Sequence, residues 1–294
     1  NSIENMNKCV IALDAGGTFL KSGLFVGKEL VAGTLDKEPV NSSSGTAEEV
    51  KKSYINIIKR MAEKAREKGL CVERISTDIP APFDYENGIS HMKHKYASIY
   101  GVPLRPWFCE AAGDVPVRFM HDSAAFIQGA AADVPECSRI AGVMIGTGFG
   151  FGMMIDSEPL RKENGEPLVE LYDKPLDGKT AEEFVSARGL VRIYEEISGK
   201  KAENGKEIGD GALAGDEMCV KAFNIMADAL VRTAFSVMKE YKIQALVLGG
   251  QISNSFPVFE KTLKDGFAGA ETPIKIVRTS NIDMVHLVGA AIGK

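Results

Sequence analysis

The segment Asp14-Ala15-Gly16-Gly17-Thr18 is the starting point for interpreting this 294-residue sequence. It stands between two apolar runs with strand character, residues 9–13 and 19–25, and is therefore predicted to be the turn of a β-hairpin. Gly16 and Gly17 allow positive φ angles and expose N–H groups that can bind an anion. Asp14 is suited to hold hydrated Mg²⁺ beside phosphates. The alternative is an ordinary hairpin, whose turn requires glycine anyway.

A second segment repeats this arrangement. Residues 140–145 are apolar, Gly146-Thr147-Gly148 follows, and residues 149–155 form another strand-like run. The repetition suggests an internal duplication, with one hairpin at the start of each half. Two such turns would hold a polyphosphate from both sides of a cleft. The spacing is not the dinucleotide-binding fingerprint, because Phe151 stands where that motif needs glycine.

Asp122 lies where a strand-like run, residues 115–120, is followed by a helical run, residues 124–132. The helix dipole favours a carboxylate at this junction. Two interpretations stay open, because Asp122 could also be a simple N-cap. The adjacent His121 is equally ambiguous, since a lone histidine is more often structural than catalytic.

Three further segments are candidate site elements. The proline-containing loop of residues 80–88 is stiff and irregular, and is either part of a binding site or a plain surface turn. Lys93-His94-Lys95 lies in the most basic patch and is either a solvated loop or an arm that reaches a polar or anionic substrate. Gly249-Gly250 follows a buried strand and leaves room for a flat group.

Helix signals are clear in the second half of the chain. Thr180 and Glu183 are predicted to form a capping box for a helix that carries Leu190 and Ile193. Asp216 is predicted to cap a long helix. A closing helix is expected over residues 284–292.

Composition narrows the class of protein. Hydrophobic residues make up 45% and charged residues 26% of a 294-residue chain, which predicts a globular protein of one large or two medium domains. A net charge of −5 argues against general nucleic-acid binding. The five cysteines are dispersed, which fits reduced thiols, and the given residues show neither the pattern of a signal peptide nor a long apolar span. We therefore expect a cytoplasmic protein with no membrane association.

The motifs at residues 14–18, 121–122, 146–148 and 248–250 resemble, in order and spacing, those of the ROK family. This is a family of sugar kinases within the actin-like, Hsp70-like and hexokinase-like ATPase superfamily. The resemblance covers essentially the whole chain. It implies an α/β fold of two ribonuclease-H-like (actin-like ATPase) domains around a central cleft. The N-terminal domain is expected over residues 1–118 plus 282–294, and the C-terminal domain over 119–281.

The resemblance also implies a role for each motif. Asp122 is expected to be the general base, and ATP and Mg²⁺ the cofactors, with Asp14 binding Mg²⁺ through water. The residues expected to bind the phosphates are Asp14, Gly16, Gly17, Thr18, Gly146, Thr147 and Gly148. The adenosine is expected at Gly249 and Gly250. The residues expected to bind a small sugar substrate are His121, Glu170, Lys95, His94 and Pro82, with Glu166 as the alternative to Glu170.

The sequence departs from the family pattern on the sugar side. His121 stands where the family usually has Asn, and Lys93-His94-Lys95 stands where it often has Pro-Asn-Leu. The structural zinc motif is absent, because residues 156–179 contain no cysteine or histidine. These departures concern the residues expected to bind the sugar and not those expected to bind ATP.

The expected activity is ATP-dependent phosphorylation of a hydroxyl of a hexose or N-acetylhexosamine, by a protein that is a homodimer if it follows the family. The alternative is a catalytically silent homologue that binds a sugar or nucleotide as a sensor or regulator. Family members that repress transcription carry a winged-helix module before the first hairpin, and we expect none here because the first strand begins near Cys9.

Overall fold

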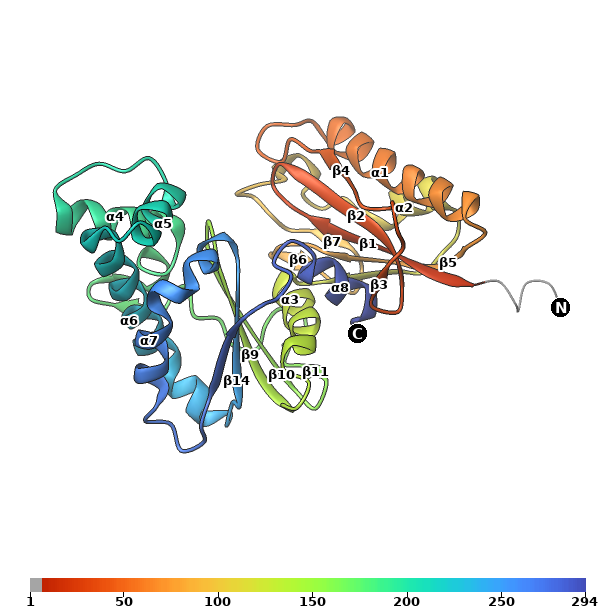
Figure 1. Ribbon diagram of the computed structural model, residues 1–294. Helices are drawn as coiled ribbons and strands as arrows, with labels where there is room; N and C mark the ends of the chain where they lie inside the picture. The colour runs from red at the N-terminus through yellow and green to blue at the C-terminus, as the bar shows by residue number, and fades with distance from the viewer. Residues whose placement is uncertain (1–6) are drawn as a thin grey trace. The chain divides into compact units, whose positions relative to one another are not determined.

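The computed structural model describes residues 7–294, which divide into two compact α/β units (Figure 1). The first unit contains the chain up to Gly129, together with Arg161–Glu166 and Asp283–Lys294. The second contains Ala130–Leu160 and Pro167–Ile282. No helix within residues 7–294 is both long and apolar enough to cross a membrane.

The first unit is built on a mixed sheet with the strand order β3-β2-β1-β5-β8. Antiparallel pairing joins β1 to β2, whereas β5 pairs in parallel with both β1 and β8. Its strands are β1 (Lys8–Ala15), β2 (Phe19–Val26), β3 (Glu29–Leu30), β4 (Asp36–Pro39), β5 (Cys71–Asp78) and β8 (Val117–Met120), and β4 pairs with β2. The parallel strands β1, β5 and β8 therefore end at the same edge of this sheet.

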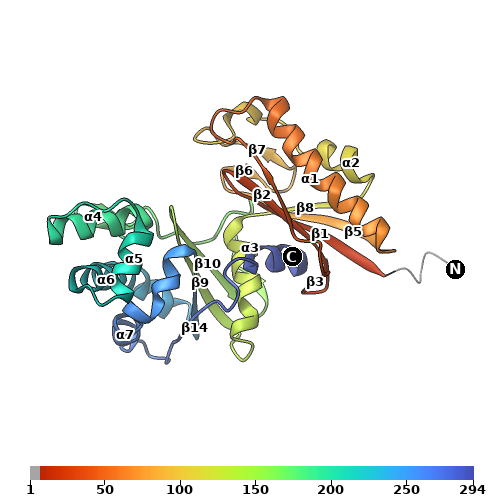
Figure 2. The same cartoon turned by 45° about the horizontal axis from the view of Figure 1, so that its top comes forward.

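Helices cover both faces of this sheet. On one face α1 (Ala47–Glu67) and α2 (Arg105–Ala112) pack over Ile11, Leu13 and Leu20, and Figure 2 shows the two helices side by side. On the other face α3 (Asp122–Ala130) and α8 (Val285–Ile292) pack over Ala12 and Phe25. A small hairpin of β6 (Phe83–Asp84) and β7 (Ile89–Ser90) follows β5, and the 3-10 turn η1 (Ala97–Ile99) comes after it.

The second unit repeats the same sheet order as β11-β10-β9-β14-β15. Its strands are β9 (Arg139–Ile145), β10 (Phe149–Ile155), β11 (Glu158–Pro159), β14 (Ala245–Gly249) and β15 (Lys275–Arg278). Antiparallel pairing joins β9 to β10, and β14 pairs in parallel with β9 and β15. Each unit thus opens with a glycine-rich hairpin, which confirms the predicted duplication.

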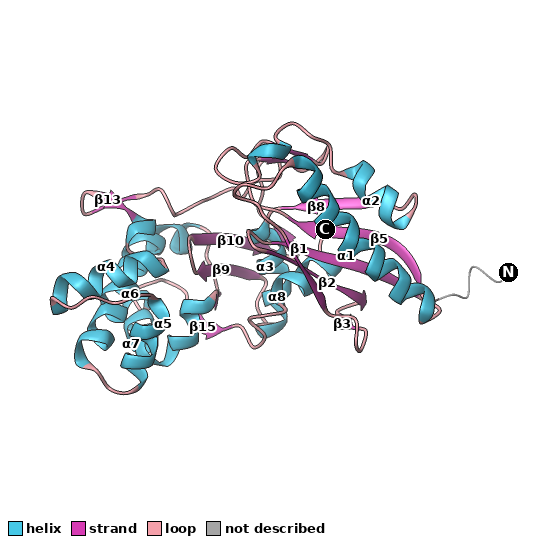
Figure 3. Ribbon diagram, turned by 90° about the horizontal axis from the view of Figure 1, so that it is seen from above, coloured by secondary structure: helices cyan, strands magenta, loops and turns pink. Residues whose placement is uncertain are grey.

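The helices of the second unit gather around one long helix (Figure 3). They are α4 (Ala187–Ser198), α5 (Gly205–Leu213), α6 (Glu217–Glu240) and α7 (Phe256–Phe267), and they share a core with the sheet. Asp216 caps α6 as predicted, because its Oδ1 accepts the N–H of Met218 at 3.0 Å. The short strands β12 (Pro175–Leu176) and β13 (Lys179–Thr180) and the 3-10 turns η2 (Ala131–Asp133), η3 (Ala181–Glu183) and η4 (Gln251–Ser255) complete this unit.

One helix start was predicted at the wrong place. Thr180 and Glu183 do form a capping box, but it caps only the 3-10 turn η3. The helix α4 begins at Ala187, and the Ser186 hydroxyl caps it by accepting the N–H of Gly189 at 3.0 Å. The 3-10 turn therefore ends after three residues, and a separate helix begins at the second cap.

The first compact unit extends to Gly129. Residues 119–129 stay with the first unit, because Met120 pairs with Asp78 and α3 packs closely on α8. A Cβ at Gly129 would lie 2.0 Å from the carbonyl oxygen of Val285. The predicted domain limits and the central cleft stay predictions.

Candidate active site

Asp122 stands at the start of α3, directly after the end of β8. Its Oδ1 lies 2.9 Å from Nδ1 of His121, and 38% of its side chain is exposed. Burial acts to raise the pKa of Asp122, but the positive charges of His121, His286 and Lys95 outweigh it and hold the pKa well below its usual range. Asp122 is therefore a carboxylate at neutral pH and can accept a proton.

His121, rather than Asp122, caps this helix. The carbonyl oxygen of His121 accepts the N–H of Ala125 at 3.1 Å, so His121 occupies the N-cap position and Asp122 the first helical position. The Nδ1 atom of His121 accepts the N–H of Ser123 at 3.0 Å, which is the usual bond of a capping side chain. Asp122 is therefore not the N-cap of α3, because His121 occupies that position.

The first glycine turn requires glycine, but for a different reason than the positive φ angles that were predicted. Neither Gly16 nor Gly17 adopts a positive φ. The N–H of Gly16 instead donates to the carbonyl of Phe19 at 3.0 Å, and a Cβ at Gly16 would lie 2.7 Å from that oxygen. Glycine is needed at position 16 for this close approach of the backbone and not for an unusual φ.

Asp78 is a residue that sequence reasoning missed. It is paired with Asp14 across the parallel strands β5 and β1 and is fully buried. Its Oδ1 accepts the N–H of Ala15 at 3.2 Å, whereas its Oδ2 is buried without a hydrogen-bond partner in the described chain. Burial and the charges of Asp14 and Asp122 raise the pKa of Asp78. The feature of the sequence that could have identified Asp78 is an acidic residue at the end of a predicted strand.

The residues predicted to bind substrate are only partly brought together. Lys95 is half-buried, and its charge acts on Asp122. His94 and Pro82 are exposed, and the only cis peptide among residues 7–294 precedes Pro82. His286 on α8 was missed, and its ring lies 5.5 Å from that of Phe126. Nothing in the spacing of the sequence links α8 to α3.

The two candidate glutamates fall in different units. Glu170 lies in the second unit, whereas Glu166 lies in the first together with Asp122. Gly165, next to Glu166, packs against Tyr85, since a Cβ there would lie 3.0 Å from the Tyr85 ring. The centroid of that ring is 6.1 Å from the centroid of the His121 ring. The structure thus brings the segment of Glu166 to the neighbourhood of Asp122.

The second glycine turn, Gly146-Thr147-Gly148, is held by the start of α4. The N–H of Ala187 donates to the Gly146 carbonyl at 2.7 Å, and the N–H of Phe149 donates to Oε1 of Glu182 at 3.0 Å. Arg188 bonds both the Thr147 carbonyl at 3.4 Å and Oε2 of Glu182 at 3.3 Å. Glu182 and Arg188 were not predicted, because they are distant from the turn in sequence.

Gly250 has a structural reason to be glycine. Its φ is +81°, and a Cβ there would lie 2.3 Å from the carbonyl oxygen of Ile145 at the end of β9. The neighbouring Gly249 is the buried last residue of β14. The predicted adenosine contact of these glycines stays a prediction, since close packing alone accounts for Gly250.

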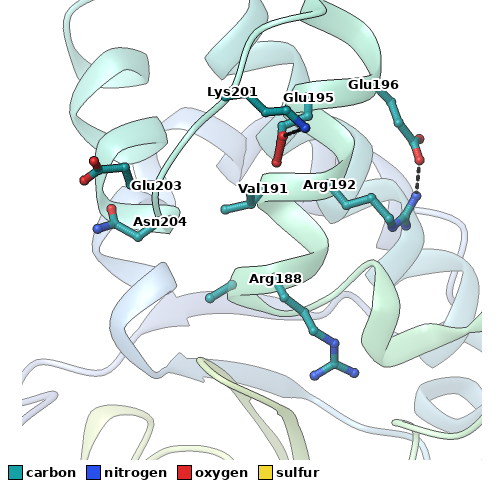
Figure 4. A pocket seen from close by; sticks show the side chains of 10 residues that line it. Arg188, Val191, Arg192, Glu195, Glu196, Lys201, Glu203 and Asn204 are labelled. Atoms are coloured by element: carbon teal, nitrogen blue, oxygen red, sulfur yellow. Dashed lines mark hydrogen bonds and ion pairs between the residues drawn. The ribbon is translucent and has the colours of Figure 1, made fainter.

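A cavity of about 680 Å³ lies in the second unit, between the start of α4 and the segment before α5 (Figure 4). It is lined by the start of α4, including Arg188 and Val191, and by the segment before α5, including Asn204 and Gly205. Arg188 connects it to the Gly146-Thr147-Gly148 turn. Gly205 connects it to η4, because a Cβ there would lie 2.8 Å from Cδ1 of Ile252. The cavity was not predicted from the sequence.

A sequence profile described as the ROK family matches residues 10–167 and 175–292. The chain belongs to the ROK family. It is 22% identical over 297 residues to an N-acetyl-D-glucosamine kinase of Histophilus somni, covering 92% of this chain and 91% of that protein. The predicted family is thereby confirmed.

Solved structures of similar proteins confirm the fold class of this ROK-family chain. The crystal structure of a glucokinase from Parabacteroides distasonis matches with a TM-score of 0.80 and 24% identity, over 97% of each chain. A ROK family glucokinase from Streptomyces griseus, in complex with glucose and AMPPNP, matches with a TM-score of 0.75 and 19% identity, over 96% of this chain and 98% of that one. The predicted actin-like α/β architecture of two ribonuclease-H-like domains is therefore correct.

Proposed function

We propose that this ROK-family protein is an ATP-dependent sugar kinase, which transfers the γ-phosphoryl group of Mg-ATP to a hydroxyl of a hexose or N-acetylhexosamine. The observation that carries the proposal is Asp122, a carboxylate kept ionised at the start of α3 and paired with His121 at 2.9 Å. The similar proteins named as N-acetyl-D-glucosamine kinase and glucokinase support the same reaction class.

Asp122 accepts the proton of the attacking hydroxyl. A carboxylate with a lowered pKa is a weak base, but phosphoryl transfer asks little of the base because its transition state is loose and the hydroxyl proton leaves late. General-base catalysis of this kind contributes roughly 10²–10⁴-fold to the rate. The ion pair with His121 keeps the Asp122 oxygens directed at one place, so that positioning and charge do most of the work.

The glycine turns bind the phosphates of ATP, and the cavity beside α4 takes its base. The N–H of Gly16 donates to the Phe19 carbonyl, so the groups that the first turn offers to a phosphate are the N–H groups of Gly17 and Thr18. The cavity borders both Arg188 and the segment after Gly250, which connects a base in the cavity to phosphates at the Gly146-Thr147-Gly148 turn. Its volume of about 680 Å³ lies within the usual range for small-ligand sites.

Asp14 and Asp78 fit a hydrated Mg²⁺ ion. The buried Oδ2 of Asp78 lacks a hydrogen-bond partner among the described residues, and Asp78 is the register partner of Asp14, so a cation would give this acidic pair a partner that the side chains do not supply. Carboxylates are the protein ligands that Mg²⁺ prefers, usually through several retained waters. When bound, the ion offsets the charge of the phosphates. Asp14 holds its hydration shell, and Asp78 holds Asp14 in place.

The acceptor sugar is bound by residues around Asp122. His121, Lys95, His94 and Pro82 keep the roles predicted for them, and Glu166 replaces Glu170 as the glutamate that contacts the sugar. The observation that supports this exchange is the location of Glu166 in the same unit as Asp122, beside the Tyr85 ring. The cytoplasmic location and the homodimer stay predictions.

A screen of sugar-dependent ATP consumption tests the proposal. It covers hexoses, hexosamines, N-acetylated amino sugars and acidic sugars, with mass spectrometry of the product and with Asp122→Asn as the matched inactive control. We expect at least one sugar to be phosphorylated by the wild-type protein only. If Mg-ATP binds but no sugar stimulates its consumption, the catalytically silent sensor is the better description.

A further inference from the structure

The first glycine turn is held from one side by two residues that are distant from it in sequence. The hydroxyl of Tyr96 donates a hydrogen bond to the carbonyl oxygen of Gly16 at 2.5 Å. The hydroxyl of Ser42 donates to the carbonyl oxygen of Gly17, also at 2.5 Å. Two successive carbonyl groups of the turn therefore have fixed directions.

Fixing these carbonyls also fixes the N–H groups that follow them. In a trans peptide the C=O and the N–H of one peptide unit point in opposite directions. The N–H of Gly17 therefore points away from the Tyr96 hydroxyl, and the N–H of Thr18 points away from the Ser42 hydroxyl. These are N–H groups that the proposed function assigns to the phosphates, so the present inference rests on that function.

Tyr96 and Ser42 are themselves joined beneath the turn. The N–H of Tyr96 donates to the carbonyl oxygen of Ser42 at 2.7 Å. Tyr96 is fully buried and has a φ of +54°, a left-handed conformation that a bulky side chain seldom adopts. Such a conformation persists only where the surrounding structure over-determines it. The pair is thus a rigid support for the turn and not an incidental contact.

Tyr96 also connects the turn to the acceptor side of the site. It directly follows Lys95, whose charge acts on Asp122. The segment Lys93-His94-Lys95 and the glycine turn therefore share one anchor within the first unit.

We propose that Tyr96 and Ser42 are positioning residues for the phosphates of ATP: their hydroxyl groups orient the N–H groups of Gly17 and Thr18 toward the phosphate chain. Neither side chain needs to touch the nucleotide. The effect of each hydroxyl is therefore specific to ligands that carry phosphate, and this separates positioning from a general contribution to folding.

The test compares the dissociation constants of Mg-ATP and adenosine, measured by isothermal titration calorimetry. In Tyr96→Phe and in Ser42→Ala we expect the Kd of Mg-ATP to rise about threefold to tenfold, the worth of one neutral hydrogen bond. The Kd of adenosine should stay within about twofold of wild type, because adenosine has no phosphate. Ser53→Ala is the matched control, since its hydroxyl donates to the carbonyl of Pro39 at 2.8 Å, outside the turn.

An unchanged Kd of Mg-ATP in both variants overturns the proposal, and so does an equal loss of affinity for Mg-ATP and adenosine. If Tyr96→Phe fails to fold, Ser42→Ala alone decides. A wild-type protein that binds Mg-ATP but phosphorylates no sugar overturns the proposed function and leaves this inference standing. A wild-type protein that does not bind Mg-ATP overturns both.

Discussion

The Nδ1 atom of His121 lies 2.9 Å from Oδ1 of Asp122. The same nitrogen lies 3.0 Å from the backbone nitrogen of Ser123, so it caps α3 by accepting that N–H when it is unprotonated, and it donates to the Asp122 carboxylate when it is protonated. The cap determines where the helix begins, and the pairing determines the charge of the carboxylate. The residue that departs from the usual family pattern therefore combines a structural role with an electrostatic one.

Asp122→Asn removes the proton acceptor and keeps the shape of the side chain. We expect kcat to fall by about 10²–10⁴-fold, the usual contribution of a general base. The Kd of Mg-ATP should not change, because the glycine turns and the cavity are intact. Steady-state kinetics and calorimetry check the two statements, and near-normal turnover in this variant would contradict the assignment.

Substitutions at His121 separate its two roles. Asn is itself a good N-cap, so His121→Asn should keep the free energy of unfolding close to that of the wild-type protein. His121→Ala removes the cap and should lower that free energy by about 1 kcal/mol. Urea denaturation measures both. Both variants should raise the pKa of Asp122 toward its usual value, which NMR titration of the carboxyl carbon reports.

Asp78→Asn tests the buried acid through the pH dependence of stability. The pKa of Asp78 is raised in the folded protein, so folding is accompanied by uptake of a proton above the unfolded pKa. The free energy of unfolding is therefore highest below the unfolded pKa, near 3.9, where Asp78 is protonated in both states. The free energy of unfolding falls as the pH rises from the unfolded pKa through the folded pKa. The loss is about 1.4 kcal/mol for each pH unit between the two pKa values.

Asn cannot ionise, so the unfolding free energy of Asp78→Asn relative to wild type should increase between pH 5 and pH 8. Urea denaturation without Mg²⁺ at several pH values makes the comparison. A constant difference across this range would show that the pKa of Asp78 in the folded protein is not raised.

Arg188→Ala tests the support of the second glycine turn. Arg188 bonds the Thr147 carbonyl and borders the cavity, so we expect the Kd of Mg-ATP to rise about threefold to tenfold. Arg232→Ala is the control, because Arg232 pairs with Asp177 at 2.8 Å and its side chain is comparably exposed, 47% against 59%. Equal effects of the two variants would point to a general loss of charge.

Gly250→Ala measures the close approach of β14 to β9. Gly178→Ala is a control with nearly the same φ, +79° against +81°, and with no heavy atom within 4 Å of its Cβ position. The control should cost about 1 kcal/mol of unfolding free energy for the left-handed conformation alone. Gly250→Ala should cost about 1–3 kcal/mol more, because its Cβ meets the Ile145 carbonyl and its ψ of 159° places the backbone in a region that is essentially restricted to glycine. Thermal or urea denaturation makes the comparison, and equal costs would contradict the explanation that position 250 requires glycine.

Much of the fold follows from patterns that are local in the chain. Apolar runs on either side of glycine predicted both hairpins, and the change from strand to helix pattern placed Asp122 correctly. These features depend on neighbouring residues, whose alternation and propensities are visible in the sequence. The start of α4 was misplaced because two capping signals, Thr180 and Ser186, compete within a few residues.

The sequence by itself determined the hairpins, the helix caps such as Asp216, and the family motifs, because each depends on residues a few positions apart. Only the tertiary structure decided which distant residues support them. The parallel register of β1 and β5 places Asp78 beside Asp14, the start of α4 brings Arg188 to Thr147, and the buried Tyr96 reaches Gly16. Such contacts arise from strand pairing and helix packing, which join segments whose separation along the chain carries no information about their distance in space.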